Sequence, residues 1–215
     1  MGEILLSKNE VEYFIKENIL EYSLTDENDI DACYHHNSRY IDILSILKYG
    51  ILSLKKMNEL GIRHLSDEQL VLFDDITSHI NGVNGISLSV RNMKDLYKNE
   101  EEYMSDSEEL VDFTIDSNIK AVRNSSRYGN EYISYDDISV DSIRTLDFRI
   151  INLLNNSKIK DDKFYKKIAF NYNRILEAAK IIKLQQNNIA IRETSNNTNK
   201  LELDKIVELP RIRIN

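Results

Sequence analysis

Apolar residues recur at helical spacing in the first part of the chain. Across residues 9–22 they stand three and four positions apart, which predicts an amphipathic N-terminal helix. Residues 41–49 show the same spacing, and Gly50 directly after them is typical of the residue that ends a helix. Residues 52–60 are expected to form a further short helix, whereas the polar residues 23–29 predict a connection.

The middle of the chain is rich in short apolar segments that alternate with polar residues. Alternation with a period of two is typical of strands with one buried face. The glycine- and asparagine-rich residues 81–85 predict a turn before one of these segments. The expected strands are residues 32–35, 86–90, 110–115, 131–135 and 142–148.

Beyond residue 156 the pattern changes again. Apolar residues between 164 and 182 recur at steps of three and four, which predicts a helix of roughly 20 residues. Residues 189–191 and 201–203 resemble the strands of a terminal hairpin. The pattern predicts an α+β protein with two parts, a body of residues 1–155 and an appendage of residues 156–215.

The composition is that of a globular protein, with 41% hydrophobic and 30% charged residues. No apolar run approaches the ~18 residues of a membrane-spanning helix, and the N-terminus lacks the pattern of a secretory signal. The single cysteine, Cys33, excludes an internal disulfide and a multi-cysteine metal site. We therefore expect no membrane partner and a cytoplasmic location, either in the producing cell or after delivery into a target or host cell.

The net charge of −8 is unevenly distributed. Residues 158–183 contain eight basic and three acidic residues, while the first 157 residues carry a net charge of −14. A polyanionic partner would be repelled by the acidic body and would need the basic segment. The simpler interpretation, which we favour, is that these lysines solvate the outer face of a helix.

Candidate chemistry is confined to polar residues at strand ends. The chain contains no glycine-rich phosphate loop, no helical two-histidine zinc motif and no histidine at ligand spacing from a cysteine, so no metal is expected. Polar groups cluster at residues 36–39, 85–91 and 130–136. Strand ends presented by a rigid sheet often form binding sites, but polar strand ends are also common on any protein surface.

These three segments resemble motifs of one known family. HNSRYIDILSILKYGI at residues 36–51 resembles the first motif of the poly-ADP-ribose polymerase family, where His-Gly-Ser precedes Ile-Leu and a glycine followed by Leu or Ile. NEYISYD at residues 130–136 resembles the family's strand with the catalytic glutamate, commonly Asn-Glu-Tyr-Ile-x-Tyr. ISLSVR at residues 86–91 is similar to the middle motif of small bacterial and phage relatives. The motifs occur in family order within residues 31–150.

The resemblance implies a fold and an activity. The implied fold is of the ADP-ribosyltransferase type, two packed small sheets with peripheral helices, here followed by the C-terminal helical appendage. The implied reaction is transfer of ADP-ribose from NAD, as co-substrate, to a macromolecular acceptor, a protein or a nucleic acid, with release of nicotinamide. Such an enzyme would be a toxin or effector, and the abundance of Asn, Ile and Lys suggests a bacterial or phage source.

The resemblance assigns the catalytic carboxylate to Glu131. Cleavage of the bond between nicotinamide and ribose creates an oxocarbenium-like centre, and a carboxylate at the ribose hydroxyls stabilises the developing positive charge. His36 is expected to hydrogen-bond an NAD ribose hydroxyl, while its neighbour His35 faces the other way and takes part in packing. Ser89 is expected to support the glutamate or the sugar, and Arg91 to meet the pyrophosphate. The implied cofactor-binding residues are His36, Asn37, Ser38, Ser87, Ser89 and Arg91.

Some positions depart from the family pattern. Asn37 replaces the glycine that usually follows the motif histidine, which narrows the approach of the backbone to the nicotinamide amide. Ser87 stands where many polymerases have a tyrosine that stacks on nicotinamide. Tyr49, Tyr97 and Tyr128 are the candidates to provide such a ring instead.

The departures leave three functions open. Gly129 stands two residues before Glu131, where arginine-modifying relatives usually have a glutamate, and the long insert of a chain-extending polymerase is lacking. Modification of arginine and chain extension are therefore not expected. The leading hypothesis is ADP-ribose transfer to a macromolecule. The alternatives are a binding module of the same fold that has lost turnover, and an NAD glycohydrolase with water as acceptor.

Overall fold

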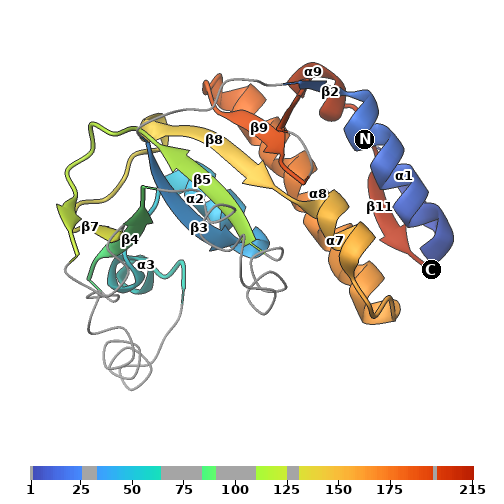
Figure 1. Ribbon diagram of the computed structural model, residues 1–215, viewed down its shortest axis with the longest axis horizontal. Coiled ribbons are helices and arrows are strands. Elements are labelled where there is room, and N and C mark those ends of the chain that lie inside the picture. Colours follow the sequence, from blue (N-terminus) through green and yellow to red (C-terminus); the bar gives the residue numbers. More distant parts are fainter. Residues whose placement is uncertain (1, 26–32, 64–83, 91–109, 125–130, 196–197) are drawn as a thin grey trace.

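The structure is a computed structural model that describes residues 2–25, 33–63, 84–90, 110–124, 131–195 and 198–215. Within these residues, nine strands form one mixed sheet and two more form a separate small sheet, with several helices around them (Figure 1). The α+β class is confirmed. In spatial order, the large sheet consists of β2 (Ser23–Thr25), β10 (Asn199–Leu201), β9 (Ala190–Glu193), β8 (Ile143–Phe148), β5 (Leu110–Ile115), β3 (Tyr34–Arg39), β4 (Ile86–Ser89), β7 (Glu131–Ser134) and β6 (Val122–Arg123).

The helices lie largely behind this sheet and at its right-hand end in Figure 1. None of the described helices is long and apolar enough to cross a bilayer. Two short 3-10 turns, η1 and η3, precede α2 and β8. The helical elements are α1 (Lys8–Glu21), η1 (Tyr40–Asp42), α2 (Ile43–Tyr49), α3 (Leu54–Glu59), η3 (Val140–Ser142), α7 (Ile150–Asn156), α8 (Asp162–Gln185) and α9 (Leu203–Ile206).

The long helix α8 is defined by its caps and its apolar stripe. The carboxylate of Asp161 accepts a hydrogen bond from the Phe164 backbone N–H at 2.8 Å, and Gln186 ends the helix in a left-handed conformation. The stripe packs against α1, α2, α7 and β11 (Arg211–Ile214). The helix therefore forms one wall of the core, with Tyr165, Ile168, Ala169, Tyr172, Ile175, Leu176, Ala179 and Ile182 all buried.

The end of α2 is fixed beside the sheet by a glycine. Gly50 has a φ of 82°, and a side chain there would collide with the carbonyl of Ile138. Ile51 and Ile138 bond to each other through both backbone groups, at 2.9 and 3.0 Å. The predicted helix stop at Gly50 is thus confirmed, and the close contact holds α2 next to the segment that leads into β8.

The two ends of the chain pair with each other. β1 (Glu3–Leu6) and β11 form a parallel two-stranded sheet, with Ile4 opposite Ile212. The side chain of Asn173 on α8 donates to the carbonyl of Ile212 and accepts from its N–H, at 2.9 and 3.0 Å. The side-chain amide of Asn173 thus forms the two hydrogen bonds that the backbone of a neighbouring strand would form, and it attaches the terminal sheet to α8.

The large sheet is weakly joined at one position. β3 and β4 share a single pair of register partners, His35 and Ser89, whereas β3 and β5 share six, from Tyr34–Ile115 to Arg39–Leu110. β4 continues normally to β7, with four partner pairs. The sheet thus consists of two parts, β2-β10-β9-β8-β5-β3 and β4-β7-β6, that separate on one side of the His35–Ser89 pair.

The expected elements and the observed ones agree in most places. The helices expected at residues 9–22, 41–49 and 164–182 are confirmed as α1, η1 with α2, and α8. The connection expected at residues 23–29 is wrong for its first part, because residues 23–25 form β2 and pair with β10. The sequence interpretation also lacked α7, a helix of seven residues directly after β8.

The terminal hairpin expected after α8 is confirmed, since β9 and β10 pair in antiparallel fashion. The hairpin extends the large sheet, however, because β9 pairs in parallel with β8 from Thr145–Ala190 to Phe148–Glu193. Strands from both sides of residue 156 therefore lie in one sheet. The domain boundary predicted after residue 155 stays a prediction.

Candidate functional site

A cavity lies where β3 and β4 separate. It has a volume of about 320 Å³ and is lined by the end of β3, the start of β4, α2 and the segment around α3. This volume is at the lower end of the range for small-molecule sites, about 300–1,000 Å³. The cavity can therefore hold a group of the size of a nucleoside, with the rest of a larger ligand extending outside it.

Two of the three sequence motifs meet in this cavity. His36, Asn37 and Ser38 from the first motif line it, and so does Ser87 from the second. The two segments lie about 50 positions apart in the chain and come together because β3 and β4 run antiparallel from the His35–Ser89 pair. These four implied cofactor-binding residues are thus brought to one place.

His36 bridges the gap between the two strands. Its Nδ1 lies 3.0 Å from the carbonyl oxygen of Ser87. A carbonyl only accepts, so Nδ1 carries the proton, and burial holds the pKa of His36 below its ordinary value. The ring is therefore neutral near pH 7, with Nε2 as a hydrogen-bond acceptor. Such an acceptor suits a ligand hydroxyl.

The opposite wall of the cavity is apolar with one aromatic ring. Ile46, Leu54 and Met57 contribute to it, together with Tyr49 from the end of α2. Tyr49 is 45% exposed, and the ammonium of Lys48 lies 4.7 Å from its ring centroid. Of the three tyrosines considered for stacking, Tyr49 lines the cavity, while positions 97 and 128 lie outside the described residues.

Glu131, the implied catalytic residue, lies next to this cavity and not in its lining. It starts β7 and is the register partner of Ser89, which is two residues from Ser87 on β4. Two residues of a strand span roughly 6.8 Å and point to the same face. The side chain of Asn124 donates to Glu131 Oε2 at 3.3 Å. Arg91, the last implied NAD contact, lies outside the described residues.

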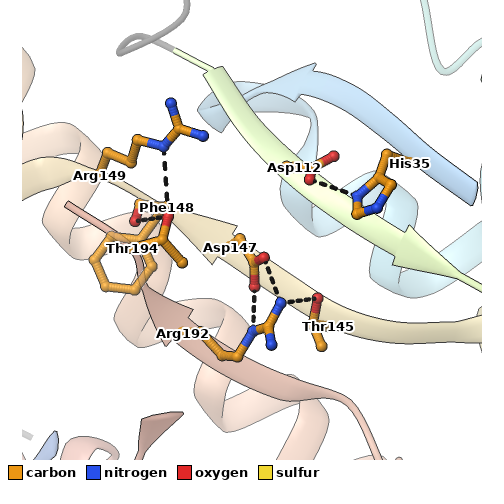
Figure 2. Close-up of polar contacts among 8 residues, drawn as sticks. All are labelled: His35, Asp112, Thr145, Asp147, Phe148, Arg149, Arg192 and Thr194. Carbon is orange, nitrogen blue, oxygen red and sulfur yellow. Dashed lines mark hydrogen bonds and ion pairs between the residues drawn. The ribbon is translucent and has the colours of Figure 1, made fainter. Parts of the chain in front are cut away.

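A second polar group lies on the same face of the sheet as Glu131. His35 is the register partner of Ser89, and its Nδ1 is 2.8 Å from Oδ2 of Asp112 on β5 (Figure 2). Burial acts to lower the pKa of His35, but the hydrogen bond and charge of Asp112 outweigh it, and the net shift is upward. His35 faces away from His36, as expected, and its largely buried ring is in addition hydrogen-bonded to the carboxylate of Asp112.

Beside this pair, Figure 2 shows Arg192 of β9 directed at Asp147 of β8. Nε and Nη2 of Arg192 donate to the two carboxylate oxygens of Asp147, each at 2.7 Å, and Nη2 lies 3.5 Å from the hydroxyl of Thr145. Both charged side chains are buried. Burial raises the pKa of Asp147 in spite of the hydrogen bonds and charge of Arg192.

Sequence reasoning missed Asp112, Asp147 and Arg192. A signal existed, because the expected strand at residues 110–115 carries polar residues at positions 112 and 114, and residues 142–148 carry them at 145 and 147. Polar residues at every second position of neighbouring strands indicate a shared polar face. The order of the strands was needed to recognise it, and that order is a property of the tertiary structure.

Comparisons with known proteins do not assign the chain to a family. No protein-family model, curated protein or solved structure matches the chain. Within the part of the chain that the structure describes, no three His, Cys, Asp or Glu side chains are grouped so that they could hold a metal ion. The groups available for chemistry at the site are a neutral imidazole acceptor, an aromatic ring, two serines and a neighbouring carboxylate.

Proposed function

We propose that the chain transfers ADP-ribose from NAD to a macromolecular acceptor and releases nicotinamide. One observation carries the proposal. The first two motifs that resemble the poly-ADP-ribose polymerase family line one cavity, and the third places Glu131 on the adjoining strand, opposite Ser89. Three segments with a shared chemical interpretation converge, although nothing in their spacing along the chain requires it. The fold proposed on the same grounds is that of the ADP-ribosyltransferases, with the two parts of the separated sheet as its two sheets.

The residues suit the chemistry of the reaction. In the proposed complex, Nε2 of His36 accepts a hydrogen bond from a ribose hydroxyl, and the Tyr49 ring offers an aromatic surface for nicotinamide. When the bond from the ribose carbon to the nicotinamide nitrogen breaks, positive charge develops on the sugar. The Glu131 carboxylate stabilises that charge through its negative field and through the sugar hydroxyls.

One observation favours a second candidate, a binding module without turnover. Glu131 does not line the cavity, and its Oε2 accepts a hydrogen bond from Asn124. A carboxylate occupied in this way would contribute to the structure of the sheet and not to catalysis. NAD hydrolysis, with water as the acceptor, is the activity expected of the active enzyme when no macromolecular acceptor is present.

The test is release of nicotinamide from NAD by the wild-type protein and by Glu131→Gln, with and without a cell lysate as the source of acceptors. Removal of one strong electrostatic contact to a transition state costs at least ~10²-fold in rate. We expect that loss in Glu131→Gln, with unchanged thermal unfolding. Glu21→Gln, an exposed glutamate at the end of α1, is the matched control and should keep the wild-type rate.

The outcomes separate the candidates. Release of nicotinamide that depends on Glu131, together with label from NAD on lysate protein or nucleic acid, supports transfer. Release without labelling of any macromolecule supports the glycohydrolase. NAD binding by calorimetry without any release identifies the binding module. A Glu131→Gln protein with the full rate would contradict the catalytic role of this residue.

A further inference from the structure

The polar face of the sheet forms a continuous row from β5 to β7. Register partners on neighbouring strands point to the same face, so His35, Ser89 and Glu131 lie side by side on β3, β4 and β7. Asp112 on β5 extends the row through its 2.8 Å contact with His35. A histidine held by a carboxylate thus lies on the same face as the proposed catalytic glutamate, whereas His36 points to the other face.

This polar face is costly for the fold. Asp112, Thr114, Thr145, Asp147 and Arg192 are all buried on it. Buried charges are weak contributors to stability even when they are paired, because their desolvation costs several kcal/mol per ion. An apolar face would therefore stabilise the sheet at least as well. Concentrations of buried ionisable groups are typical of functional sites.

In the part of the chain that the structure describes, two buried oxygen atoms in the row lack a hydrogen-bond partner. Oδ1 of Asp112 and the hydroxyl of Thr114 are both buried and have no hydrogen-bond partner among the described residues. Asp112 and Thr114 are two positions apart on β5, so both atoms lie on the face that carries His35. A purely structural network satisfies its polar atoms. The two unsatisfied atoms beside the His35–Asp112 pair show that this network is not optimised for stability alone.

The pair has the arrangement of a general base with its orienting carboxylate. Asp112, when ionised, only accepts hydrogen bonds, so His35 Nδ1 donates to it and Nε2 is the nitrogen that can take up a proton. The His35 side chain is 11% exposed, which leaves the ring in contact with solvent. His35 and Glu131 lie on strands separated by β4, a distance of roughly 9–10 Å between backbones. A sugar ring fits between groups at that separation.

We propose that His35 is the general base that takes the proton of the attacking acceptor, and that Asp112 is the positioning residue that orients its ring. The proposal rests on the proposed function and deepens it. It implies that the acceptor attacks through a group that carries a proton, such as a hydroxyl, because a carboxylate needs no base. In this arrangement His36 contacts NAD at the gap that it bridges between β3 and β4, and His35 receives the proton on the face that carries Glu131.

In the transfer step, one bond of NAD breaks, one bond to the acceptor forms and one proton moves to His35. The bond between the ribose carbon and the nicotinamide nitrogen breaks, and its electron pair stays on nicotinamide, which leaves neutral. A lone pair of the acceptor oxygen forms the new bond to the ribose carbon. The proton of that oxygen moves to His35 Nε2, and the imidazolium later releases it to solvent. No oxidant or reductant takes part.

The proposal predicts a pH dependence with a definite sign. Only neutral His35 accepts a proton, so the rate should fall as pH falls through the pKa of His35. Asp112 from β5 and Asp147 from β8 raise that pKa, while burial and Arg192 from β9 lower it. Glu131 lies two strands away on β7. Asp112→Asn removes the largest upward contribution, so the acidic limb of the rate profile should move to lower pH.

The experiment measures nicotinamide release from NAD against pH, with water as the acceptor and then with added azide. Azide is an anion that attacks without losing a proton, so it needs no base. We expect His35→Ala to lose about 10²-fold of the rate in water, the lower range for a general base, and azide to restore much of it as ADP-ribosyl azide. We expect azide not to restore Glu131→Gln. NAD affinity of His35→Ala should stay within about twofold of wild type.

If His35→Ala does not fold, Asp112→Asn tests whether His35 is the general base, because this substitution preserves the size of the side chain at position 112. We expect a lower plateau and an acidic limb shifted to lower pH. Asp116→Asn is the matched control: Asp116 directly follows β5 and pairs with Arg144 at 2.7 Å, but this ion pair is partly exposed and does not involve His35. Its rate profile should equal that of the wild type.

Each outcome has one meaning. Suppose that the wild-type protein releases nicotinamide. If His35→Ala is then equally active, or if the acidic limb of the pH–rate profile is not shifted in Asp112→Asn, the role of His35 is overturned and the proposed function stays intact. A slow His35→Ala that azide fails to restore assigns His35 a structural role and overturns the proposal as well. A wild-type protein that releases no nicotinamide with water or azide overturns the proposed function and this inference together.

Discussion

The two faces of the large sheet are built from the same strands and differ completely in chemistry. Residues of odd and even number on β8 and β9 point to opposite sides, and so do those on β5 and β3. One face is packed against the helices of the core. The apolar row is Ile191, Leu146 and Phe113, and the polar row beside it is Arg192, Asp147 and Asp112.

The difference in chemistry indicates which of the two faces stabilises the protein more. Burial of Phe113 and Leu146 removes apolar surface from water, at about 25 cal/mol for each Å². Burial of Asp147 and Arg192 requires desolvation of two ions, and their hydrogen bonds only offset that cost. A sheet that needed only stability would not place charges there. The polar face, which ends at Ser89 and Glu131, therefore carries the groups proposed for catalysis, while the cavity lined by His36 is the proposed NAD site.

The largest effect should come from breaking the buried ion pair. Asp147→Ala leaves Arg192 as a buried cation without its carboxylate, and we expect a loss of about 3–5 kcal/mol in the free energy of unfolding. Urea denaturation measures this loss. The double variant Asp147→Leu with Arg192→Met should regain most of it, because it removes both charges and fills the space. A double variant as unstable as Asp147→Ala would show that the polar face does stabilise the fold.

A smaller effect should distinguish the two adjacent histidines. His36→Ala removes a hydrogen-bond acceptor from the cavity, and we expect roughly tenfold weaker NAD binding, about 1.4 kcal/mol. His35→Ala should weaken NAD binding less, because His35 lies on the other face with Asp112. Isothermal calorimetry gives both affinities, and thermal unfolding shows that each variant is folded. The reverse order would mean that His35, and not His36, makes the main histidine contact with NAD.

The smallest effect concerns two threonines on the polar face. The hydroxyl of Thr114 has no partner among the described residues, so Thr114→Val should raise the free energy of unfolding by about 1 kcal/mol. Thr145 is the matched control, because its hydroxyl lies 3.5 Å from Nη2 of Arg192, and Thr145→Val should not stabilise. Chemical denaturation of both variants makes the comparison. Loss of stability in Thr114→Val would reveal a partner for the hydroxyl.

Most of the secondary structure could be predicted, because it depends on local patterns. The helical spacing of apolar residues gave α1, α2 and α8 within a few residues of their observed bounds. The failures were short elements whose structure depends on distant partners. β2 is a strand because it pairs with β10, and the N-terminus of α7 is satisfied by Ser195, whose hydroxyl accepts from the Asn152 N–H at 2.7 Å. Neither partner is near in the sequence.

The candidate site could be predicted only in part. The resemblance pointed to His36, Asn37, Ser38 and Ser87, and these residues do line one cavity. It did not indicate Asp112, because the pattern of a single strand cannot tell which neighbour lies beside it. For the same reason the hydrogen bond between His35 and Asp112 could not be predicted, since the two residues lie on different strands.

The sequence by itself determined the period of each element, the faces of each strand and the glycine that ends α2. These properties follow from interactions between residues a few positions apart. Only the tertiary structure decided which polar positions meet. His36 and Ser87 are 51 positions apart, and His35 and Asp112 are 77 apart. Such contacts depend on strand order and register, which the packing of the whole sheet selects, and a shift by one residue would turn every side chain of β3 to the other face.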